Sequence, residues 1–210
     1  MYFYTKFLTL NKMKLSKVWI ILIVVVAIIV ILVIWGTGIY NKMVAQDENV
    51  GKAWANVENV YQRRSDLIPN LVATVKGVAD FEKSTLTDVI EARAKATSVT
   101  IDPANLNAQS MQQFQAAQDG LSSALSRLMV VVERYPELKA TQNFLELQAQ
   151  LEGTENRISV ERMKFNETVQ AYNTYIRSFP AAVFAGMFGF EKKTPFEAQA
   201  GAEVAPKVEF

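Results

Sequence analysis

Three charged residues stand where the sequence pattern would otherwise place apolar side chains between helices: Arg64, Glu155 and Arg162. A charge on the packing face of a helix needs a partner, because its unpaired burial costs several kcal/mol. Such residues could hold an ion or a ligand inside a helical bundle, or they could form a structural layer of ion pairs that fixes helix register. The second use is the commoner one in long bundles. The sequence therefore predicts a structural polar layer in which Arg64 pairs with Glu155.

The remaining residue types offer little for catalysis. The chain has no His and no Cys, which removes the commonest general base and metal ligand together with thiol chemistry and disulfides. Glu155 and Glu161 resemble a carboxylate pair, but di-metal sites in bundles combine Glu with Glu-x-x-His motifs. No glycine-rich phosphate loop, zinc-protease motif or nucleophile elbow occurs. We therefore expect no enzyme activity, no cofactor and no metal.

An uncharged apolar run begins at Val18 and continues through Trp35 to Tyr40. About 20 helical residues cross the hydrocarbon core of a bilayer, and the apolar part of a cleaved signal peptide is only about 7 to 15 residues long. The sequence therefore predicts a retained transmembrane helix over residues 18–40, preceded by an N-terminal flank over residues 1–17. Membrane lipid is the expected partner of this helix.

The orientation of the span follows from the Lys residues beside it. Four Lys precede it and two follow it closely: Lys6, Lys12, Lys14, Lys17, Lys42 and Lys52. The positive-inside rule therefore favours a cytoplasmic N-terminus, with the rest of the chain outside the cytoplasm. The segment MKLSKVW at Met13 also resembles a natural start, and translation from Met13 would remove most of this asymmetry.

Apolar residues after Tyr40 recur in alternating steps of three and four, which place side chains on one helix face and favour coiled-coil-like packing. We expect an all-α fold: an antiparallel helical bundle over residues 41–190 and a flexible tail over residues 191–210, rich in Ala, Pro and charge. The expected helices are a first helix to about Ala96 with a bend near Ser65 to Ile68 caused by Pro69, a second from Asp102 to Tyr135, and a third from Glu137 to Phe179.

One uncharged segment, FPAAVFAGMFGF, directly follows the third expected helix. We define its large side chains as the apolar patch: Phe179, Phe184, Met187, Phe188 and Phe190. A patch of this kind is an aggregation hazard in water, so something should cover it. In an up-down-up arrangement of three helices it would lie far from the membrane. That position argues against lipid contact, so we expect the patch to support a homo-oligomer.

Several segments together resemble the LemA family of bacterial membrane proteins. They are RRSDLIPNLV (Arg63–Val72), YPELKA (Tyr135–Ala140), TENRI (Thr154–Ile158) and FNETVQAYNTYIRSFP (Phe165–Pro180). The likeness extends over about residues 40–189 and the preceding span. It implies one N-terminal span in the bacterial inner membrane, a long antiparallel bundle and no established catalytic activity. It also implies an accessory or scaffolding role beside another membrane protein.

Three classes of function follow from these patterns. The first is a membrane-anchored, non-catalytic scaffold or interaction protein that self-associates. The second is a transmembrane signal-relay or accessory protein acting with another membrane protein, in which Pro69 and the polar layer make a continuous helix bistable. An enzyme is disfavoured by the missing acid–base and metal groups. Lys and Arg balance Asp and Glu at 22 to 21, so nucleic acid is not an expected partner.

Overall fold

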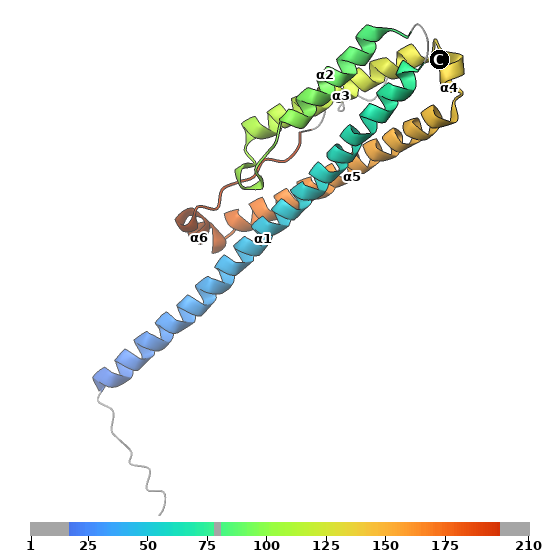
Figure 1. Cartoon of the computed structure of the whole chain (residues 1–210). Coiled ribbons are helices and arrows are strands. Elements are labelled where there is room, and N and C mark those ends of the chain that lie inside the picture. The colour runs from blue at the N-terminus through green and yellow to red at the C-terminus, as the bar shows by residue number, and fades with distance from the viewer. Residues whose placement is uncertain (1–16, 78–80, 198–210) are drawn as a thin grey trace, which may run out of the picture. The chain divides into compact units, whose positions relative to one another are not determined.

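The computed structural model describes residues 17–77 and 81–197, and these residues form helices joined by short loops, without a strand (Figure 1). The elements are α1 (Lys17–Lys76), α2 (Lys83–Ser98), the 3₁₀ turn η1 (Pro103–Asn105), α3 (Ala108–Val132), α4 (Pro136–Lys139), α5 (Gln142–Arg177) and α6 (Ala181–Phe188). The predicted all-α class and helical bundle are confirmed. Met13 and most of the predicted N-terminal flank lie outside the described residues.

The chain divides into two compact units, with the boundary after Lys42 inside α1. In the first unit, the large apolar side chains from Val18 to Trp35 are each 49–71% exposed. Among the described helices, only α1 contains a segment that is long and apolar enough to cross a membrane. A core helix of a water-soluble domain would instead bury such side chains.

The second unit is an antiparallel bundle of α1, α2, α3 and α5, as the pairing of their residues shows. Trp54 on α1 meets Phe114 on α3 and Phe165 on α5. Ten residues further along α1, Arg64 meets Ser122 and Glu155. Along α1, the contacted residue numbers increase on α3 and decrease on α5. Helix α1 therefore runs parallel to α3 and antiparallel to α5. With short connections between them, the four helices run alternately up and down (Figure 1).

The first expected helix is wrong in its extent, because α1 ends at Lys76 and the chain reverses into α2. Phe81, just before α2, packs against Tyr135 with ring centroids 5.0 Å apart. The apolar pattern resumes in α2 with the same period as in α1, so periodicity alone does not reveal the reversal. Gly77 is the local signal, and a single Gly is only a weak helix breaker.

The second and third expected helices are shorter than predicted. Asp102 caps η1 through its carboxylate, and α3 begins later, with the Asn107 side chain accepting from the backbone N–H of Ser110 at 2.9 Å. The Pro136 signal starts only the four-residue α4, and α5 begins at Gln142. Buried Leu138 fixes this turn in the core, and its carbonyl accepts a 2.8 Å hydrogen bond from Thr141.

Pro69 does not end α1, in agreement with the expectation that the helix continues through it. Proline lacks an N–H, so the carbonyl of Ser65 four residues earlier loses its helical hydrogen bond. Nε of Arg93 on α2 donates to that carbonyl at 2.8 Å. The proline therefore creates an acceptor on α1 that a neighbouring helix uses, and this bond ties α1 to α2.

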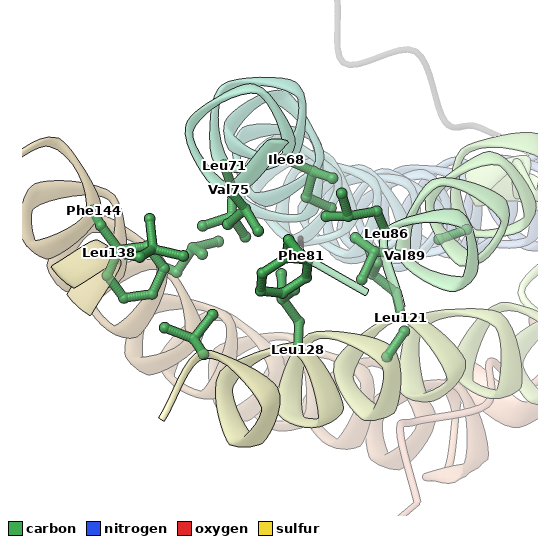
Figure 2. Packing of buried hydrophobic residues seen from close by; sticks show 14 residues of the cluster. Ile68, Leu71, Val75, Phe81, Leu86, Val89, Leu121, Leu128, Leu138 and Phe144 are labelled. Atoms are coloured by element: carbon green, nitrogen blue, oxygen red, sulfur yellow. The ribbon is translucent and has the colours of Figure 1, made fainter. Parts of the chain in front are cut away.

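Two apolar regions lie on either side of Arg64 along α1. Toward the loop after α1, mostly aliphatic side chains from five helices and one loop residue meet in one cluster, whose labelled members in Figure 2 are Ile68, Leu71, Val75, Phe81, Leu86, Val89, Leu121, Leu128, Leu138 and Phe144. Toward Asp47, rings gather around Trp54: Phe114 at 5.1 Å, Phe165 at 5.4 Å and Phe196 at 6.0 Å between ring centroids. The polar layer thus separates a mostly aliphatic core from an aromatic one.

Four helical passes return the chain to the end of the bundle at which α1 enters it. There Nζ of Lys193 pairs with a carboxylate oxygen of Asp47 at 3.3 Å. The sequence pattern predicted three passes, with the apolar patch at the opposite end. That placement is wrong, because the reversal at Gly77 adds a pass.

Candidate functional site

Arg64 is the centre of the polar layer and is 2% exposed. Its Nη1 donates to Ser122 at 2.8 Å and to Glu155 at 2.9 Å, and its Nη2 donates to the side-chain oxygen of Gln118 at 2.7 Å. Gln118 in turn donates to the carbonyl of Ala96 at the end of α2, at 3.2 Å. One guanidinium therefore connects α1 to α3 and α5 directly and to α2 through one amide.

The structure brings Arg64 and Glu155 together, but the two differ in burial. The Glu155 side chain is 54% exposed, so only the arginine is in the interior. The guanidinium also lies 5.1 Å from the centre of the Tyr61 ring. Burial raises the pKa of Tyr61, and the cations of Arg162 and Arg64 oppose that rise. Every hydrogen-bonding partner of Arg64 is a group of the bundle itself, and its buried Nε has no partner.

Arg162, the third predicted member of the layer, is placed differently. Its guanidinium lies 4.5 Å from the centre of the Phe196 ring and donates to the carbonyl of Glu197 at 3.2 Å. Glu161 pairs with Lys164 one helical turn away, at 2.7 Å, rather than with Glu155. No group of three or more metal-ligating side chains gathers anywhere in residues 17–77 and 81–197.

Residues 191–197, which we call the strap, run along the bundle without helical structure. Asn173 on α5 exchanges two hydrogen bonds with the backbone of Lys193, at 2.8 and 2.9 Å. Asn166, seven residues earlier on α5, does the same with Phe196, at 3.1 and 2.8 Å. Seven helical residues rise about 10.5 Å, and three extended residues span about 10 Å, so the two spacings match.

The strap also contacts the other side of the bundle through Lys193, which is 7% exposed. Besides Asp47, its Nζ donates to the carbonyls of Ala104 at 3.0 Å and Pro103 at 3.3 Å, between α2 and α3. The Tyr172 hydroxyl donates to the carbonyl of Glu191 at 3.0 Å. Burial, and then the Asp47 and Glu191 carboxylates, raise the pKa of Tyr172 to about 12, so the phenol remains a donor at neutral pH.

The flexible tail expected from Glu191 is therefore replaced, over residues 191–197, by a segment with defined partners. Phe196 is only 5% exposed and stacks on Trp54. The remainder of the expected tail, residues 198–210, lies outside the described residues. The strap closes the aromatic core on the side that α1, α3 and α5 leave open.

The apolar patch lies immediately before the strap, and most of it faces outward. Phe179 is 84% exposed, Met187 72% and Phe188 53%, while Phe184 and Phe190 are partly buried. Phe184 and Phe188 stack with nearly parallel rings 6.5 Å apart. The patch therefore presents apolar area without any charge between Ser178 and Phe190.

An open hollow of about 760 Å³ lies over α3 beside the strap. Small and polar side chains line most of it, including Gln112, Gln115, Asp119, Ser122, Ser123, Ser126, Thr194 and Glu197. Nothing in this lining pairs a nucleophile with a base, because Ser stands here without His or Lys. An open hollow with a mixed polar and apolar lining suits contact with a protein surface better than enclosure of a small molecule.

The family model of the LemA family matches residues 53–210. The chain belongs to the LemA family. The sequence resemblance is thereby confirmed over the bundle and the strap.

Curated relatives of this LemA-family chain include magnetosome protein MamQ 2 of Paramagnetospirillum magneticum, which is 27% identical over 175 residues, covering 75% of this chain and 64% of the relative. Magnetosome protein MamQ of Magnetospirillum gryphiswaldense is 26% identical over 172 residues, covering 73% and 62%. Protein LemA of Metamycoplasma hominis is 21% identical over 145 residues, covering 68% and 61%. The chain thus spans less than two thirds of these relatives, and neither the family nor the relatives carry an enzyme's name.

Sequence reasoning missed the residues that hold the strap of this LemA-family protein. Asn166 and Asn173 are one heptad apart, and that spacing is the readable signal. Asn within a helix is otherwise a poor helix former, so two at the spacing of a helix face indicate side chains with partners outside the helix. Lys193 gave no such signal, because its partners, the Asp47 carboxylate and two backbone carbonyls, are distant in sequence.

Proposed function

We propose that this LemA-family protein is a membrane-anchored, non-catalytic scaffold whose bundle holds another membrane protein beside the lipid surface. One observation carries the proposal: an uncharged helix with exposed apolar side chains from Val18 to Trp35 continues, in the same α1, into a bundle. Exposed apolar residues over that length suit lipid and not water. The family and the names of the relatives agree with a membrane-associated protein that is not an enzyme.

The surface that supports a scaffolding role is the hollow over α3. It is open, has a mixed polar and apolar lining, and is formed by α3 and the strap, which the hydrogen bond from Gln115 to the carbonyl of Glu197 joins. Both Nη atoms of Arg64 and Nζ of Lys193 already have hydrogen-bond partners inside the bundle. An external molecule would therefore bind the outer surface of the bundle and not an interior site, which favours a protein partner over a small-molecule substrate.

Anchoring is tested by washing membranes with alkaline carbonate, which releases peripheral proteins. We expect the protein to stay in the membrane pellet, and a Val26→Arg/Ile28→Arg variant to be released, because each Arg at the centre of a span costs about 2.5–3.5 kcal/mol. A matched Val26→Leu/Ile28→Leu variant should stay. Release of the unaltered protein would contradict the anchor.

Orientation is tested with protease added to intact spheroplasts of a bacterial host. The Lys residues before the span favour a bundle outside the cytoplasm at the inner membrane, so the protease should digest it. Protection until the membrane is breached would reverse the orientation.

The partner is sought with a photo-crosslinking residue at exposed Ser123 in the hollow, and a site at exposed Ala73 on α1 is the control.

A further inference from the structure

The outward side of α6 lacks the polar residues that a helix on the surface of a water-soluble bundle normally shows. Ala181 and Ala185 are buried and form the inward face. Val183 and Met187, one turn apart on another face, are 56% and 72% exposed. A helix that is apolar on all sides is expected inside a protein or in contact with lipid. Since α6 is at the surface of its unit, its outer face needs a covering partner.

The position of α6 limits what that partner is. The strap that follows it is fixed to α1, because Lys193, three residues after Phe190, pairs with Asp47 at 3.3 Å. Asp47 is seven residues beyond Tyr40, where the apolar run ends. Even a fully extended chain covers no more than about 25 Å in seven residues. This bound on Asp47 holds at any angle between the two units, and α6 ends five residues before Lys193, so α6 lies at the end of the bundle that is joined to the span.

We propose that the outer face of α6 lies in the interfacial layer of the bilayer surface that the span leaves, as a second, shallow membrane contact. The proposal rests on the anchoring part of the proposed function. Eight residues are too few to cross a bilayer, but a short apolar face can enter the boundary between headgroups and acyl chains. Exposed Arg177 and Lys192 flank α6 and suit lipid phosphates, with Glu191 as the opposing charge.

A second copy of the chain is the competing occupant of the same face. The sequence analysis favoured it because it placed the patch far from the membrane, and four helical passes remove that reason. The ion pair between Lys193 and Asp47 and the short segment from Tyr40 to Asp47 keep α6 at the span end of the bundle in every molecule, whereas a second copy must be recruited. Lipid is therefore the occupant that the connectivity of the chain favours.

The experiment uses the absence of Cys from the chain, which allows single-site labelling of the full-length protein. Met187→Cys and Val130→Cys carry an environment-sensitive fluorophore in proteoliposomes. Val130 is a matched control, because it is 71% exposed against 72% for Met187 and lies near the end of α3, at the other end of the bundle. Nitroxide-bearing lipids and aqueous iodide are the two quenchers. Val183→Cys is a second reporter on the outer face.

We expect the label at position 187 to shift to shorter wavelength, to be quenched by nitroxide lipid and to be protected from iodide by about fivefold relative to position 130. Free access of iodide to position 187 would overturn the proposal. A label that is shielded from iodide but not quenched by nitroxide lipid would also overturn the proposal. Energy transfer between labelled copies would then identify a second copy as the cover, and no energy transfer would identify the chain itself. Flotation of the vesicles reports the anchor separately: protein that floats with position 187 in water refutes only this inference, and protein that does not float refutes the proposed function.

Discussion

In two neighbouring segments the usual relation between hydropathy and burial is reversed: apolar side chains of α6 are exposed, and residues of the charged strap are buried. The segment around α6 has no charged residue, yet Met187 and Phe188 face outward. The strap, EKKTPFE, is mostly charged, yet Lys193 and Phe196 are buried. The difference lies in partners, because α5 and the loop between α2 and α3 supply hydrogen bonds at the spacing of the strap backbone. Burial here follows from available hydrogen-bond partners and from topology more than from residue hydropathy.

The largest effect should come from replacing matched Phe residues on the two segments. Phe196→Ala should lower the free energy of unfolding by about 3–5 kcal/mol, since it empties a position against Trp54 and Phe165. Phe188→Ala should cost less than about 1 kcal/mol, because the side chain is already 53% exposed. Thermal unfolding of the detergent-solubilised variants, followed by circular dichroism, measures both. Equal losses would abolish the contrast between the strap and α6.

A smaller effect should separate the buried and exposed members of the polar layer. Arg64→Met should cost on the order of 2–3 kcal/mol, because it leaves the buried oxygen of Gln118 without its donor. Glu155→Gln should cost less than about 1 kcal/mol, since its side chain is 54% exposed. The sequence places both residues on packing faces, where the loss of either charge would be expected to cost several kcal/mol. A double-mutant cycle on the unfolding free energies gives the coupling, and a loss at Glu155 as large as that at Arg64 would place the pair in the interior.

The smallest effect concerns the amide of one strap residue. Asn173→Ala removes the acceptor of the Lys193 N–H, so hydrogen exchange at that amide should accelerate about tenfold, the equivalent of roughly 1.4 kcal/mol of local opening. Asn173→Asp keeps an acceptor oxygen and should accelerate it less. Asn49→Ala, at an exposed site on α1, is the control and should leave the amide unchanged. An unchanged Lys193 amide in Asn173→Ala would mean that the asparagine does not hold the strap.

The sequence was sufficient for the helical class, the apolar N-terminal helix, the family and the choice of Arg64 and Glu155 as neighbours. These features depend on the spacing of apolar residues and on charged residues that interrupt that spacing, and a single sequence displays both. The reversal at Gly77 was missed because α1 and α2 share one period. The strap was missed because its stability comes from backbone groups of Lys193 and Phe196, which every residue possesses. Features that depend on distant backbone partners leave little trace in residue type.

The strap also orders the events of synthesis. Lys193 and the carbonyl of Pro103 are 90 residues apart in the chain, and the strap is made after every helix that it contacts. Domains form from the N-terminus onward during translation, so α1, α2 and α3 can associate while α5 is still emerging. Until residue 196 has left the ribosome, the face of Trp54 that Phe196 later covers has no ring against it. A nascent chain of this protein is thus open on one side during elongation and closes only when its strap arrives, which makes that interval the time at which a chaperone has access to its aromatic core.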